Sequence, residues 1–260
     1  MSSVMYKPPL TIARYTFLEA LRARLFYLMI TGLVCAFGLS EFIGELAITE
    51  GDRFQGAILA AGLRLFAVFT IGLFVTTSMV REFNDKGFEL VLSQPIPRAA
   101  YYCGKLIGFT MFAVVVACLI ALPLALYATI DQVFIWLVSL ICELLIVISL
   151  GLLCLFTFSN ITIAFSAVVA FYLLARCMDA IRLISSSPLL ETSTLSQEVI
   201  EDVINAIAWL LPDLDLFTQT QWLVYANGDM NSLVPVLVQT LIYVIFLSGA
   251  ALFDLYRKEL

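Results

Sequence analysis

Residues 132–175 read QVFIWLVSLICELLIVISLGLLCLFTFSNITIAFSAVVAFYLLA, and these 44 residues contain one charged side chain, that of Glu143. As a single helix the stretch would be roughly 66 Å long, about twice the thickness of the hydrocarbon core of a bilayer. It therefore predicts two membrane-spanning helices. The polar residues 157–160, TFSN, are the expected break, because Ser159 or Asn160 can cap the helix that follows.

The whole chain has the composition of a membrane protein. Apolar residues make up 62% of its 260 residues and charged residues 13%, whereas soluble domains are about 45–50% apolar and about 25% charged. Long windows without charge recur along the chain. We therefore predict an all-α integral membrane protein, a single transmembrane domain over residues 1–260. Its six expected spans are about 25–47, 60–80, 105–128, 133–157, 161–183 and 233–255.

The distribution of charge predicts the orientation. With six spans, the N-terminal segment, the loop 81–104 with Lys105, and the C-terminus share one face, and they hold ten of the fourteen basic residues. The positive-inside rule makes that face, and both termini, cytoplasmic. The opposite face is acidic, with most of its carboxylates in 41–52 and 185–232.

Two segments outside the spans have helical patterns of their own. In 8–24, Phe17, Leu18 and Leu21 share one arc, which predicts an amphipathic helix lying in the membrane interface. In 185–232, apolar residues at helical spacing predict a helix over 195–210. A second short helix is expected over 216–226, capped by Asp215. We interpret 185–232 as an outer lid, re-entrant or interfacial, on the outer leaflet.

The sequence lacks the residues and motifs that several kinds of catalytic and binding site require. The sequence has no histidine, no G-x-S-x-G and no G-x-x-x-x-G-K-[ST] phosphate loop; Gly104-Lys105 is followed by Leu106. The six cysteines form no C-x-x-C pair and are expected to be small buried apolar side chains. We predict no catalytic residue, no metal site and no nucleic-acid partner.

Ionisable residues within the expected spans are costly and tend to be functional. Glu143 is either a substrate- or proton-facing carboxylate or an interhelical hydrogen-bonding contact. Arg64 is expected to snorkel or to pair with Glu41 or Glu45. The last group, spaced three residues apart, is either a structural ladder of charges or a substrate site: Arg176, Asp179 and Arg182.

The loop 81–104, REFNDKGFELVLSQPIPRAAYYCG, is the largest element of the basic face. Glu82 and Lys86 are four apart, which favours a helix, and Pro95 and Pro97 end it. The helix carries exposed apolar residues that a partner's groove could bury; the alternative is an ordinary solvated loop.

This loop resembles that of type-2 ABC exporter permeases, through Arg81-Glu82, Gly87, the segment LSQPIPR at 92–98, and Gly104-Lys105. The resemblance implies a permease of the bacterial inner membrane that pairs with a second copy or a paralogue. It also implies two cytoplasmic ATPase subunits that bind ATP and Mg, and no cofactor in this chain. The implied ATPase-coupling residues are Arg81, Glu82, Phe83, Lys86, Gly87, Phe88 and Glu89.

Three functions compete at this stage. An exporter moves its substrate outward, and the scarcity of polar residues in the spans favours lipid-like, amphipathic or peptide cargo. A mechanotransmission or maturation subunit passes ATPase motion to a periplasmic partner, with 185–232 as the docking surface. An ion-coupled secondary transporter uses Glu143 as its proton site, although no inverted repeat supports it.

Overall fold

The structure, a computed structural model, describes residues 8–46, 51–85, 96–158, 160–185 and 195–257. Six helices in these ranges are long and apolar enough to cross a membrane, which confirms the predicted six-span, all-α fold. The helices, with one short 3-10 turn η1, are α1 (Pro8–Arg22), α2 (Arg24–Leu46), α3 (Gly51–Asn84), α5 (Arg98–Leu124), α6 (Ile130–Thr157), α7 (Ile161–Ser185), α8 (Leu195–Leu210), α9 (Gln221–Tyr225), η1 (Met230–Ser232) and α10 (Leu233–Arg257).

The chain breaks between α6 and α7 where the sequence predicted it. Helix α6 ends at Thr157, and α7 begins at Ile161. The side chain of Asn160 caps α7, because its Oδ1 accepts a hydrogen bond from the backbone N–H of Thr162 at 3.0 Å.

Helix α6 is the centre of the bundle and packs against α3, α5, α7 and α10. Its side chains are buried nearly all round, among them Trp136, Leu140 and Ile148. This explains why its sequence has no polar face. By contrast, α10 exposes many large apolar side chains, such as Leu241 and Phe246, and these suit contact with lipid or with a partner in the bilayer.

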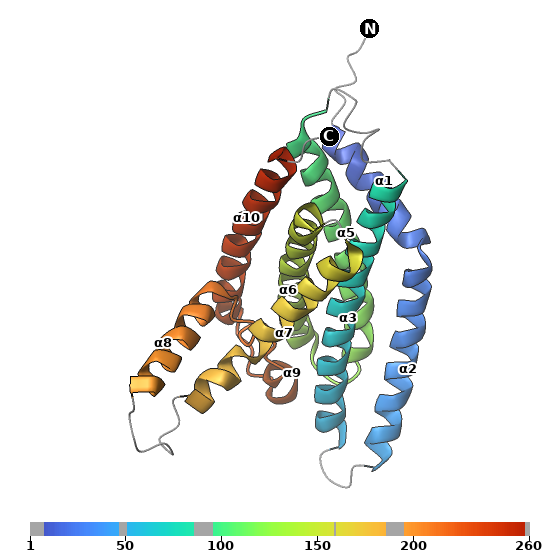
Figure 1. The fold of residues 1–260 in the computed structure, drawn as a ribbon. Helices are drawn as coiled ribbons and strands as arrows, with labels where there is room; N and C mark the ends of the chain where they lie inside the picture. The colour runs from blue at the N-terminus through green and yellow to red at the C-terminus, as the bar shows by residue number, and fades with distance from the viewer. Residues whose placement is uncertain (1–7, 47–50, 86–95, 159, 186–194, 258–260) are drawn as a thin grey trace.

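The start of α1 and the end of α10 lie at the same end of the bundle, together with the C-terminus of α3 and the N-terminus of α5 (Figure 1). Helix α1 also lies there and meets α2 at an angle. The described parts of the basic segments, namely α1, the end of α3, the start of α5 and the end of α10, are therefore gathered at one end, as an even number of spans requires.

Several local predictions were wrong. Only Gln221–Tyr225 is helical within 216–226, and the residue before it is Thr220, not Asp215. Helix α5 ends at Leu124, one residue after Pro123, and not near 128. Of the six cysteines, only Cys142 and Cys154 are buried.

Candidate functional site

Helix α1 packs closely on α5 through two glycines one turn apart. A Cβ on Gly104 would lie 2.8 Å from the Cβ of Ile12, and one on Gly108 would lie 2.7 Å from the Cβ of Thr16. This is the small-xxx-small arrangement by which membrane helices approach each other. The buried side chains of α1 are accordingly small: Ala13, Thr16 and Ala20. The larger residues of the predicted apolar arc, Phe17, Leu18 and Leu21, are half-buried or exposed.

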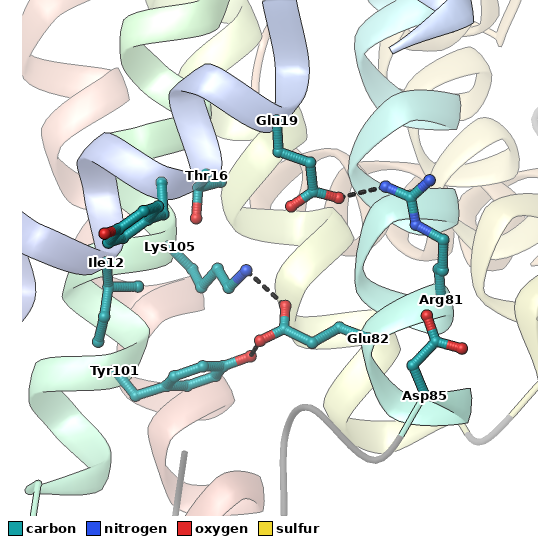
Figure 2. Close-up of a pocket in the computed structure, with 9 residues that line it drawn as sticks. Ile12, Thr16, Glu19, Arg81, Glu82, Asp85, Tyr101 and Lys105 are labelled. Atoms are coloured by element: carbon teal, nitrogen blue, oxygen red, sulfur yellow. Dashed lines mark hydrogen bonds and ion pairs between the residues drawn. The ribbon is translucent and has the colours of Figure 1, made fainter. Parts of the chain in front are cut away.

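A charged cluster joins the end of α3 to α5 beside this contact (Figure 2). Glu82 forms an ion pair with Lys105, whose side chain is 6% exposed. Glu82 also accepts a hydrogen bond from the hydroxyl of Tyr101 at 2.9 Å. The Nζ of Lys105 lies 5.9 Å from the centroid of the Tyr101 ring. A buried ammonium thus has its charge partner and an aromatic face, as burial of a charge requires.

The same cluster joins α3 to α1. Arg81 forms an ion pair with Glu19, which also accepts a hydrogen bond from Ser78 at 3.2 Å. The five residues Glu19, Arg81, Glu82, Tyr101 and Lys105 are called the clasp below. They line a cavity of about 380 Å³. Three helices distant in sequence are therefore held together at the end of α3.

A second polar cluster lies deep in the bundle around Arg64, whose side chain is 3% exposed. Its Nη1 donates to Glu143 Oε2 at 2.8 Å and to the backbone carbonyl of Phe217 at 2.7 Å. Its guanidinium carbon lies 4.9 Å from the centroid of the Trp136 ring. Tyr172 completes the cluster by donating from its hydroxyl to Glu143 Oε1 at 2.9 Å. The cluster, named the arginine core below, joins α3, α6, α7 and the chain between α8 and α9.

The chain between α8 and α9 re-enters the bundle. Leu211, Leu214 and Phe217 are buried, and the carbonyl of Phe217 accepts hydrogen bonds from Arg64 and Ser139. Ser139 lies nine residues along α6 from Ile130, which is roughly 14 Å at helical rise. Irregular backbone is tolerated at such depth only where protein satisfies its polar groups. This part of the predicted outer lid is therefore inserted into the bundle and does not rest on its surface.

Two further contacts hold the re-entrant chain. Gln132 and Gly228 exchange two hydrogen bonds of 3.1 Å, side chain to backbone. Tyr243 of α10 donates to the carbonyl of Leu210 at 3.1 Å. Asp213 belongs to the same re-entrant chain. Burial raises the pKa of its carboxyl above its usual value, and the nearby carboxylate of Asp179 raises it further.

The sequence pattern of one family, described as ABC-2 family transporter protein, matches residues 46–253. This match covers most of the chain, from the last residue of α2 to Phe253 in α10. The chain belongs to the ABC-2 transporter family. This match confirms the type-2 resemblance drawn from the loop 81–104. The chain is therefore a multi-pass membrane permease of an ABC transporter, and permeases of this family work with an ABC ATPase. No curated protein matches the chain.

Three of the seven expected coupling residues of the permease lie within the described ranges. Arg81 and Glu82 belong to the clasp, and Phe83 packs its ring 6.2 Å from that of Phe156. The predicted pairing of Glu82 with Lys86 involves a residue outside the described ranges; within them, Glu82 pairs with Lys105, whose side chain is buried. The four remaining coupling residues lie outside the described residues: Lys86, Gly87, Phe88 and Glu89.

Arg64 departs from its predicted pairing, whereas Asp179 and Arg182 lie near each other as expected. Arg64 is buried against Glu143, so it does not snorkel, and Glu41 accepts a hydrogen bond from Tyr127. The side chain of Glu45, the other expected partner, lies outside those described. On α7, Arg182 lies 3.9 Å from Asp179. Arg176 is not in the ladder, because it forms no ion pair among the described residues.

Two features of the site were missed from the sequence. The spacing of Gly104 and Gly108 is a visible signal for close helix packing. Nothing in the sequence marks Arg64 and Glu143 as partners, since they are 79 positions apart.

Proposed function

We propose that the permease is the membrane-spanning half of an ATP-driven exporter, working as a dimer with itself or a paralogue. Two cytoplasmic ATPase subunits would bind ATP and Mg and engage residues 81–89. The clasp supports this proposal best. In a chain of this family, the clasp anchors the end of α3, where the expected coupling segment begins.

The clasp gives ATPase motion a route into the membrane. Helix α3 is continuous over its 34 residues, Gly51–Asn84. From Glu82 to Arg64 it spans 18 residues, or roughly 27 Å. A displacement at its end therefore acts on α1 and α5 through the clasp, and on α6 and the re-entrant chain through the arginine core.

Cysteine crosslinking tests the engagement. In a background without native cysteines, we expect Lys86→Cys to crosslink to a co-expressed ATPase subunit, whereas Asn227→Cys, at the opposite end of the bundle, should not. Absence of a crosslink at every position from 81 to 90 would refute the coupling role of this segment.

ATPase stimulation tests what the motion accomplishes. For an exporter, purified complex in liposomes should hydrolyse ATP faster when an amphipathic cargo is added. Stimulation only by a periplasmic protein would favour mechanotransmission. Transport driven by an ion gradient without any ATPase would favour a secondary transporter, and this is disfavoured by the enclosure of Glu143 between Arg64 and Tyr172.

A further inference from the structure

A second cavity, of about 700 Å³, lies where α1 meets α2 and adjoins the clasp through Arg81. Three arginines line it: Arg22, Arg24 and Arg81. No acidic side chain is among the described residues that line it. Its apolar lining includes Leu25 and Phe74. The cavity therefore offers a positive rim beside an apolar wall.

Two of the three arginines have no counter-charge within the described ranges. Arg81 pairs with Glu19, but Arg22 and Arg24 are exposed and form no ion pair with any described residue. Ala23 lies between the ends of the two helices, and so places both arginines at the corner where the chain turns. The unpaired charge at this corner is about two positive units.

The helix that begins at the corner adds to this potential. Helix α2 is 23 residues long and starts at Arg24. The N-terminus of such a helix carries roughly half a positive charge and favours anions. Arginine also presents a planar fork of donors that matches the oxygens of a phosphate.

The surface beyond the corner is apolar. Tyr27, Leu28 and Val34 of α2 are at least 60% exposed in the chain. They begin within one turn of Arg24, so an anion held at the corner can place attached hydrocarbon chains along α2. A free phosphate would leave both the apolar wall and this surface unused.

We propose that this corner cavity binds the phosphate headgroup of an anionic lipid from the leaflet at that end of the bundle. Arg22 and Arg24 hold the phosphate, and Arg81 completes the rim. The acyl chains follow α2. The site does not depend on what the permease transports or on its ATPase.

Native mass spectrometry of the detergent-purified permease tests the proposal. The probes are phosphatidylglycerol and phosphatidylcholine with the same acyl chains, with inorganic phosphate as competitor. The variant is Arg22→Gln/Arg24→Gln. Its matched control, Arg14→Gln/Arg257→Gln, removes the same charge from exposed arginines that do not line the cavity.

We expect the Arg22→Gln/Arg24→Gln variant to bind phosphatidylglycerol about tenfold more weakly, since each arginine near an anionic headgroup contributes about a fivefold factor at most. The control pair should bind like the wild type, and phosphatidylcholine should bind weakly to all three proteins. If the double variant does not purify, Arg22→Gln and Arg24→Gln are measured singly, and each should weaken binding about threefold.

Three outcomes would overturn the proposal. An equal loss in the control pair would mean general attraction to a basic surface. Equal binding of both lipids by the wild type would remove the role of the anionic headgroup. Displacement of phosphatidylglycerol by an equimolar amount of inorganic phosphate would make the corner a site for the free anion.

Discussion

At the scale of single residues, the buried ion pair of Arg64 and Glu143 is costly to break on one side only. The variant Arg64→Met leaves Glu143 buried without its counter-charge, which typically costs about 3–5 kcal/mol. It also removes a donor from the carbonyl of Phe217. We expect a clear drop in the thermal stability of the detergent-solubilised permease, measured by fluorescence-detected size exclusion after heating.

The double variant Arg64→Met/Glu143→Leu is the control for this prediction. Replacing a buried ion pair by apolar side chains of similar size is often neutral. The double variant should therefore recover at least half of the stability lost by Arg64→Met. If the stability lost by the double variant equals the sum of the losses of Arg64→Met and Glu143→Leu, the two charges do not act as a pair.

The two ion pairs of the clasp allow a matched comparison of burial. The side chains of Lys105 and Glu82 are 6% and 19% exposed, whereas those of Arg81 and Glu19 are 60% and 36% exposed. Exposed pairs contribute about 0–1 kcal/mol, and a buried lysine without a partner costs more. We expect Glu82→Ala to lower the melting temperature by several degrees and Glu19→Ala to change it little. Equal effects would contradict the assigned burial.

At the scale of elements, the contact between α1 and α5 depends on two residues of α5 without a side chain, Gly104 and Gly108. In the variant Gly108→Ala the new methyl group would lie 2.8 Å from the carbonyl oxygen of Ala13, so α1 must move. We expect faster tryptic cleavage at the arginines of α1. Gly249→Ala is the control, because its methyl group would meet no atom within 4 Å. Unchanged cleavage in Gly108→Ala would refute the close packing.

The same elements show how far the sequence could predict the structure. Uncharged windows predicted every spanning helix, because hydrocarbon excludes charge over a fixed length. The buried side of α1 was not predicted, since that helix buries alanine and threonine on glycine and not its leucines. The sequence left open whether 185–232 is re-entrant or interfacial. The partners that satisfy its buried polar groups, Arg64, Ser139 and Gln132, are distant from it in sequence, so no local pattern announces them.

At the scale of the whole molecule, the start of α1, the end of α3 and the end of α10 lie at one end of the bundle (Figure 1). The clasp and the corner cavity both include Arg81, near the end of α3. The family match establishes a permease. The distribution of charge predicts which end faces the cytoplasm: ten of the fourteen basic residues belong to the N-terminal segment, the loop 81–104 with Lys105, and the C-terminus, and basic segments are retained on the cytoplasmic side.

Labelling with a membrane-impermeant maleimide tests this orientation in a background without native cysteines. Asp85 and Asn227 are both exposed and lie near opposite ends of the bundle. We expect Asn227→Cys to be labelled in intact spheroplasts and Asp85→Cys only after the membrane is opened. The opposite pattern would put the clasp outside the cell, where no cytoplasmic ATPase could reach the end of α3. The coupling proposal would then fail, although the six-helix fold, the arginine core and the basic corner would stand.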